Sequence, residues 1–188
     1  EEGMNYVLVG VRRAGKSFML YQRMQQNLQQ GIGWDKMLYV NFEDERLINM
    51  EASELNLLLE AFARIYANDR PILFLDELQN VVGWEKFARR LADSKFRVYI
   101  TGSNARMLSA EIATTLGGRY IMKEVYPYSF AEYIDAHRVS RTKTAQTATK
   151  TRAVLQRHLD EYMQYGGFPE CISLPAKRDY LMGVYQKS

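Results

Sequence analysis

One short stretch near the N-terminus combines residue types and spacing that suit phosphate binding: Gly10-Val11-Arg12-Arg13-Ala14-Gly15-Lys16-Ser17. In the pattern Gly, four residues, Gly-Lys-Ser, the backbone curls so that successive N–H groups converge on phosphate oxygens. Gly10 and Gly15 are expected to supply backbone freedom that side chains would obstruct. We expect Lys16 to reach the β- and γ-phosphates of a nucleotide and Ser17 to offer its hydroxyl to Mg²⁺. The stretch therefore predicts a P-loop.

The surroundings of this stretch support the same interpretation. An apolar run at residues 6–9 precedes it, and a helical pattern opens at Phe18. A helix that begins at the loop places its positive dipole end toward the bound anion. The residues that we predict to contact the nucleotide are Gly10, Arg12, Arg13, Ala14, Gly15, Lys16, Ser17 and Phe18.

A second motif, Asp76-Glu77, follows the apolar run at residues 71–75. This is the Walker B pattern, in which Asp76 orients Mg²⁺ through its water shell and Glu77 polarises the water that attacks the γ-phosphate. The alternative is a strand followed by an acidic N-cap for the next helix. Because a P-loop is present in the same chain, we favour the catalytic interpretation.

Two further positions are candidates for catalytic roles. A strand at about residues 96–101 ends in Gly102-Ser103-Asn104, where a polar side chain would lie between Mg²⁺ and the attacking water. Asn104, or else Ser103, is the candidate, and an ordinary helix N-cap is the alternative. Arg119 follows two glycines, and could act as an arginine finger on its own site or on that of a neighbouring subunit in a homo-oligomer. Its alternative is a local role at a helix end or with a carboxylate.

Apolar periodicity places these motifs in an α/β fold. A strand as apolar as residues 71–75 is expected to be buried on both faces, and charged residues after a strand mark the ligand side of a parallel sheet. Ser53 and Ser129 are expected to cap helices. The predicted strands are at about 5–9, 37–42, 71–77, 96–101 and 120–125, and the predicted helices at about 15–30, 53–68, 84–92, 105–116, 130–137, 153–165 and 179–185.

Composition narrows the function classes. The 188 residues carry a net charge of +3, which is weak evidence for nucleic acid. One cysteine, Cys171, and two histidines exclude an internal disulfide framework and a zinc site built from several cysteines. No apolar run approaches the roughly twenty residues that cross a bilayer, and no secretory pattern opens the chain. We therefore expect a cytoplasmic protein without membrane partners.

The C-terminal third differs in composition. Residues 138–152 are rich in Thr, Lys and Arg without apolar periodicity, which predicts a mobile basic loop. A solvated linker is the favoured interpretation, with nucleic-acid contact through Arg138, Arg141, Lys143, Lys150 and Arg152 as the alternative. The expected organisation is an ATPase core at 1–136, this loop at 137–152 and a helical extension at 153–188 that begins a truncated following region.

Taken together, these motifs resemble the AAA-type ATPases of the STAND-like branch, in particular prokaryotic ATPases with the P-loop G-x-R-R-x-G-K-[ST]. The match also rests on Asn41-Phe42-Glu43-Asp44, Leu75-Asp76-Glu77, Thr101-Gly102-Ser103, Gly117-Gly118-Arg119-Tyr120, Pro127-Tyr128-Ser129-Phe130 and Gly167-Phe168-Pro169. The resemblance implies a three-layer α/β/α P-loop NTPase with parallel strand order 5-1-4-3-2. It also implies that Pro169 lies near the nucleotide and reports its state to a following C-terminal domain of unknown function. The 188 residues do not include the stretch that precedes the first strand in this family and can cover the adenine.

The function expected from motifs and resemblance is Mg²⁺-dependent hydrolysis of ATP to ADP and phosphate. ATP is preferred over GTP because the guanine motif Asn-Lys-x-Asp is absent from the sequence. Two alternatives stay open: a nucleotide-gated switch with little turnover, and a DNA-handling motor that uses the basic loop. The sequence names no protein partner.

Overall fold

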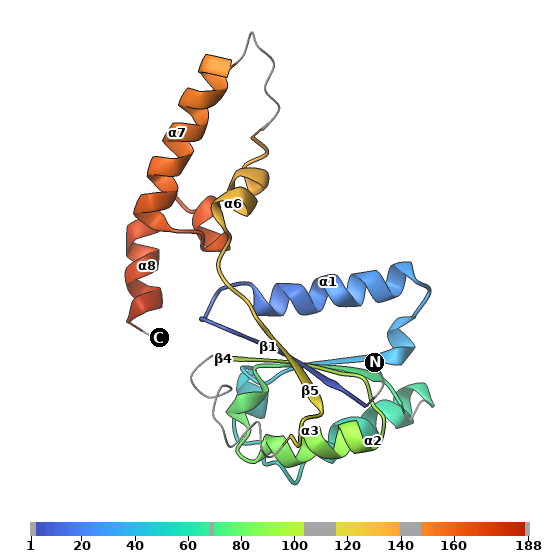
Figure 1. The fold of residues 1–188 in the computed structure, drawn as a ribbon. Coiled ribbons are helices and arrows are strands. Elements are labelled where there is room, and N and C mark those ends of the chain that lie inside the picture. The colour runs from blue at the N-terminus through green and yellow to red at the C-terminus, as the bar shows by residue number, and fades with distance from the viewer. Residues whose placement is uncertain (1–2, 68–69, 104–115, 140–147, 187–188) are drawn as a thin grey trace. The chain divides into compact units, whose positions relative to one another are not determined.

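The computed structural model describes residues 3–67, 70–103, 116–139 and 148–186, and within these the chain divides into two compact units (Figure 1). The first unit comprises Glu1–Gly10 and Lys16–Val125. The second comprises Val11–Gly15 and Tyr126–Ser188.

The first unit is built on a five-stranded sheet in which all four described strand pairs are parallel. The strand order β2-β3-β4-β1-β5 is the predicted order read from the other edge, so the fold class and topology are confirmed. Parallel pairing brings the carboxyl ends of the strands to one edge, where ligands bind in such sheets. The strands are β1 (Asn5–Gly10), β2 (Met37–Asn41), β3 (Ile72–Asp76), β4 (Val98–Ser103) and β5 (Tyr120–Glu124).

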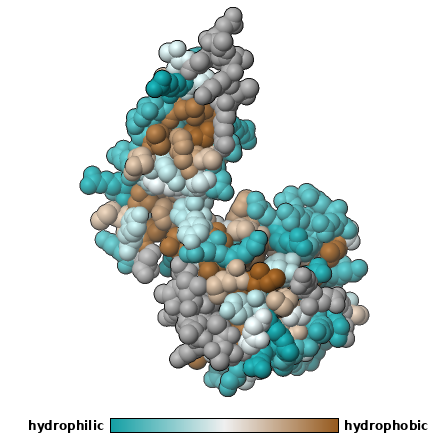
Figure 2. Space-filling model, in the orientation of Figure 1, coloured by the Kyte–Doolittle hydropathy of each residue, from teal (hydrophilic) through white to brown (hydrophobic). Residues whose placement is uncertain are grey.

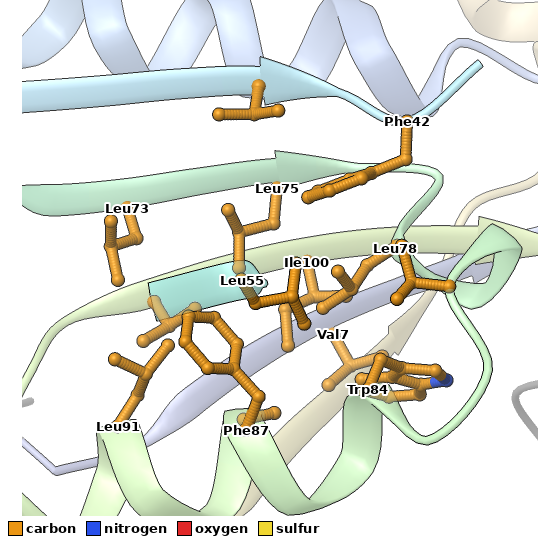
Figure 3. Close-up of a cluster of buried hydrophobic side chains, with 14 of the residues drawn as sticks. Val7, Phe42, Leu55, Leu73, Leu75, Leu78, Trp84, Phe87, Leu91 and Ile100 are labelled. Atoms are coloured by element: carbon orange, nitrogen blue, oxygen red, sulfur yellow. The ribbon is translucent and has the colours of Figure 1, made fainter. Parts of the chain in front are cut away.

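Helices cover both faces of this sheet, which gives the three-layer α/β/α architecture. Figure 1 shows α1 (Lys16–Gln29) on one face, with α2 (Leu55–Tyr66) and α3 (Trp84–Asp93) on the other. Apolar side chains from alternate strand positions meet those of α2 and α3 in the main core (Figure 3). This core includes Val7, Leu73, Leu75, Ile100, Leu55, Trp84, Phe87 and Leu91.

The opposite face of the sheet, toward α1, carries an aromatic row. Tyr6, Tyr99 and Phe74 lie in register on three neighbouring strands, and their rings are stacked with centroids 5.0 Å apart in both pairs. Tyr39 is in register with Phe74 on the next strand. Because side chains alternate along a strand, Asp76 and Thr101 share this face with Phe74 and Tyr99. The sheet thus aims two polar groups toward the helix that follows the P-loop.

The N-terminal boundary of α2 differs from expectation. The N-cap of α2 is Glu54 and not Ser53, because the Ser53 hydroxyl contacts the Glu51 carboxylate at 3.4 Å instead of capping the helix. The helix expected at 105–116 lies almost wholly outside the described residues. Short 3-10 turns complete the unit at η1 (Trp34–Lys36), η2 (Glu45–Leu47) and η3 (Leu78–Asn80).

The second unit is helical, with α6 (Phe130–Ala136), α7 (Ala148–Tyr165), η4 (Pro169–Ile172) and α8 (Lys177–Tyr185). Ser129 caps α6 as predicted, and Glu132 returns the bond in a capping box. Helix α7 begins five residues before the periodicity predicts, so Lys150 and Arg152 are helical. Apolar surface is visible along the helices of this unit (Figure 2), and Met163 on α7 is 77% exposed. In the described part of the chain no helix is long and apolar enough to span a membrane.

Aromatic and imidazole rings pack between α6 and α7. Tyr133 lies 4.4 Å from His137 and 6.0 Å from His158 between ring centroids, and the two imidazoles are 4.8 Å apart. Burial lowers the pKa of His137 and raises the pKa of Tyr133 to about 12. Both groups are therefore held in their neutral forms at neutral pH.

The segment that leads into η4 requires a glycine at position 167. Its carbonyl accepts a hydrogen bond from Tyr128 N at 2.7 Å, and a Cβ there would lie 1.9 Å from Tyr128 O. We expect Gly167→Ala to destabilise the protein by about 3 kcal/mol through this backbone clash. Circular dichroism should show a melting temperature lower by roughly 6–12 °C.

Gly166→Ala is the matched control for that variant. Gly166 has φ +71° but nothing within 4 Å of an added Cβ, so the change costs only backbone strain of about 1 kcal/mol. Equal losses in the two variants would contradict the steric explanation.

Candidate functional site

Lys16, at the start of α1, is buried among the polar groups of the first unit. Its Nζ donates to the Gly10 carbonyl at 3.2 Å and lies 3.5 Å from Oε1 of Glu77. Its side chain is 3% exposed, so the ion pair lies in an environment with little water screening. The P-loop lysine and the Walker B glutamate predicted from sequence are thus brought together.

Asp76 ends β3 and is 2% exposed. The Thr101 hydroxyl, from β4, donates to Oδ1, and the Tyr39 hydroxyl, from β2, donates to Oδ2 at 2.9 Å. Both carboxylate oxygens therefore accept a hydrogen bond from a neighbouring strand. The carboxylate is fixed at the strand end that the sequence assigned to it.

Glu77 has an unusual backbone conformation for a residue other than glycine, with φ 55° and ψ 40°. Its N–H donates to Oγ1 of Thr101 at 2.9 Å, and its Oε2 accepts from Nε2 of Gln79 at 2.6 Å. Such strained conformations persist only where the surroundings hold them. Thr101 therefore orients both acidic residues, since it donates to Asp76 and accepts from the backbone of Glu77.

The sequence analysis gave no site role to Tyr39 or to Thr101, although Thr101 belongs to one of the motifs that carry the resemblance, because a threonine and a tyrosine within strands are explained by β propensity alone. The signal that could have found them is the alternation along the strands. Thr101 is two residues from Tyr99, and Tyr39 is in register with Phe74, two residues before Asp76. The pairing of β2, β3 and β4 brings these side chains to one face.

The first P-loop glycine is required by a close approach of two strands. A Cβ on Gly10 would lie 2.1 Å from the carbonyl oxygen of Val125, which follows β5. Val125 N in turn donates to Val9 O at 2.6 Å. The expectation that a side chain would obstruct the backbone at Gly10 thus has a specific physical cause.

The loop residues 11–15 belong to the second unit, where they lie against its C-terminal elements. Gly15 has φ 102°, which favours glycine, and a Cβ there would lie 4.0 Å from Cγ of Pro169. Arg13 donates to Oε2 of Glu170 at 3.3 Å, and its guanidinium lies 5.0 Å from the centroid of the Tyr180 ring. Pro169 and the loop are therefore neighbours in this unit.

The other residues that the sequence predicts for the site either make none of these contacts or lie outside the described residues. Arg119 pairs with Asp93 at the end of α3, and its carbonyl accepts from Asn5 N at the amino end of β1. It therefore lies at the edge of the sheet opposite Asp76. Ser103 is in register with Gly10, whereas Asn104, Arg141 and Lys143 lie outside the described residues. Ser17 is half-buried, Ala14 is buried, and Arg12 and Phe18 are exposed.

Comparison with known proteins places this arrangement in a family. Residues 3–134 match the AAA domain. The chain belongs to the AAA domain family. Among its AAA relatives, the uncharacterized protein MJ1544 of Methanocaldococcus jannaschii is 39% identical over 188 residues, covering 96% of this chain and 41% of that protein. An uncharacterized protein of Haemophilus influenzae is 38% identical over 184 residues, covering 95% of this chain and 43% of its own length.

A crystal structure of Cdc6p from Pyrobaculum aerophilum also matches, with a TM-score of 0.49 and 17% identity over 71% of this chain and 42% of that one. The chain spans less than half the length of the two relatives above. Membership of the AAA domain family agrees with the P-loop fold described here and implies a nucleotide-binding domain of the ATPase type.

Proposed function

We propose that this domain binds ATP and hydrolyses it to ADP and phosphate with Mg²⁺. The observation that carries the proposal is the grouping of Lys16, Asp76 and Glu77 at the carboxyl edge of the parallel sheet. In this proposal Lys16 and the loop amides bind phosphate, and Glu77 takes the proton of the attacking water. Thr101 keeps the two acidic residues in their relative positions.

The residues present fit Mg²⁺. The described residues contain no group of three or more His, Cys, Asp and Glu that could hold a metal alone. Mg²⁺ does not require one, since it retains waters and is bound through one or two protein oxygens and the phosphates of its nucleotide. Ser17 and Asp76 offer those hard oxygen donors. When bound, the ion would neutralise charge that develops on the phosphates.

The contacts of the loop support coupling between nucleotide state and the C-terminal helices. Arg13 binds Glu170 and covers Tyr180, and Gly15 lies beside Pro169. A loop that changes on nucleotide binding would alter these contacts directly. We therefore propose that nucleotide state is passed to the C-terminal unit and, through it, to a following domain, as in the STAND-like branch.

The same contacts favour a nucleotide-gated switch with little turnover as the second candidate function. A switch needs a link between the loop and a responding element, and the pairing of Arg13 with Glu170 is such a link.

We also propose that Arg119, half-exposed at the opposite edge of the sheet, acts on the site of a neighbouring subunit. Both ideas depend on the same nucleotide site.

Thermal unfolding with ATP, ADP and GTP, each with and without Mg²⁺, tests the proposed function. A ligand at one hundred times its dissociation constant adds about 2.7 kcal/mol, which corresponds to a rise of roughly 5–10 °C in melting temperature for a chain of this size. We expect this rise with adenine nucleotides and Mg²⁺. If none of the nucleotides raised the melting temperature, the proposal would be contradicted. Measuring phosphate release under the same conditions separates an ATPase from a switch with little turnover.

A further inference from the structure

Asp76 lies at the end of a chain of hydroxyl groups within the first unit. The Tyr39 hydroxyl donates to Oδ2 of Asp76 at 2.9 Å. A phenol has one proton, and that of Tyr39 is used on the carboxylate, so Tyr21 is the donor in the 2.9 Å contact between the two tyrosine hydroxyls. Donation therefore runs from Tyr21 to Tyr39 to Asp76.

The Tyr39 side chain is held in place by its neighbours. It is in register with Phe74 beside the stacked aromatic row, and its ring lies 5.4 Å from that of Tyr21 between centroids. These contacts hold the Tyr39 ring in place and keep its hydroxyl beside Oδ2 of Asp76.

The chain of hydroxyls joins the two elements that carry the proposed Mg²⁺ ligands. Tyr21 and Ser17 are four residues apart on α1 and therefore share one face of the helix. Tyr39 links that helix to Asp76 on β3. We propose that Tyr39, supported by Tyr21, is a positioning residue that orients the Asp76 carboxylate toward Mg²⁺. This inference rests on the proposed function, because the metal-binding role of Asp76 is part of it.

The physical basis is the freedom of a carboxylate to rotate about its last side-chain bond. Thr101 restrains Oδ1, and Tyr39 restrains Oδ2. Without one of these two hydroxyl donors, the Asp76 carboxylate is free to rotate, and its orientation must be fixed when Mg²⁺ binds. Loss of an outer partner of a metal ligand commonly weakens metal affinity by about 10–100-fold.

The variant Tyr39→Phe tests this inference because it retains the ring and removes only the hydroxyl. The dissociation constant of adenylyl imidodiphosphate, a non-hydrolysable ATP analogue, should be measured in excess MgCl₂ and in EDTA. The dissociation constant in EDTA divided by that in MgCl₂ reports how much Mg²⁺ contributes to nucleotide binding. We expect Tyr39→Phe to reduce this ratio about tenfold, with the constant in EDTA changed little.

Tyr99→Phe, on β4 of the same sheet, is the matched control. It removes a hydroxyl that accepts from Nε of Arg23 at 3.0 Å, and it should leave the ratio at the wild-type value. Tyr21→Phe tests the same chain from its exposed end without altering the sheet, and a reduction of about threefold is expected. This second variant decides the matter if Tyr39→Phe proves too unstable to assay.

The outcomes separate the inference from the proposed function. If Mg²⁺ strengthens binding of the analogue to the wild-type protein and the ratio is the same in Tyr39→Phe, the positioning role is overturned and the proposed function stands. A reduced ratio in Tyr99→Phe as large as that in Tyr39→Phe would also overturn it, because the effect would then not depend on Asp76. A wild-type protein that binds the analogue equally with and without Mg²⁺ would overturn both.

Discussion

Replacement of Glu77 by Gln is expected to reduce the rate of phosphate release at least a hundredfold while the affinity for ATP changes less than about threefold. The amide has the size of the carboxylate and can still accept from Gln79, but it cannot take a proton from water. General bases contribute roughly 10²–10⁴-fold to catalysis, which sets the size of the expected loss. Phosphate release and equilibrium binding of ATP are the two measurements.

Glu45→Gln is a suitable control for this variant, because it makes the same change at an exposed carboxylate in η2. It should hydrolyse ATP at the wild-type rate. If Glu77→Gln turned over ATP as fast as the wild-type protein, Glu77 would not be the base. A large loss of affinity in Glu77→Gln would instead show that its pairing with Lys16 organises the binding site.

Replacement of Lys16 by Ala is expected to act on binding itself. The ammonium group is buried near Gly10 and Glu77, where an interaction with phosphate would be weakly screened by water. Hydrogen bonds to charged groups contribute about 1.5–3 kcal/mol, so the dissociation constant for ATP should rise by about a hundredfold. Isothermal titration calorimetry or a fluorescent nucleotide analogue can measure the change.

The control for Lys16→Ala is Lys36→Ala, which removes an exposed ammonium from η1. Its affinity for ATP should equal that of the wild-type protein. Thermal unfolding without nucleotide should accompany both variants, since Lys16→Ala also removes the partner of Glu77. An unchanged dissociation constant in a folded Lys16→Ala protein would mean that this loop is not the phosphate site.

Much of the first unit could be predicted from the sequence because its signals are local. The run at 72–75 is apolar at every position and buried from Leu73 onward, as expected of a strand covered on both faces, and the glycines and Lys16 have the spacing of a P-loop. The parallel order β2-β3-β4-β1-β5 was implied by the resemblance and is confirmed by the strand pairing. Local signals failed at Ser53. Its hydroxyl donates to the Glu51 carboxylate, and Glu54 occupies the N-cap position of α2.

By itself, the sequence determined the strands and the described helices of the first unit and the positions of Lys16, Asp76 and Glu77 along the chain, and it predicted the kind of chemistry that these residues can perform. Only the tertiary structure decided which uncharged groups hold them. Thr101, Tyr39 and Tyr21 come from three different elements, and their hydroxyls meet Asp76, Glu77 or one another through strand register and helix packing. The pairing of Arg13 with Glu170 joins residues 157 positions apart in the same way. Alternation along the strands can place such side chains on one face of the sheet, but it cannot pair them, because each contact depends on how distant elements align.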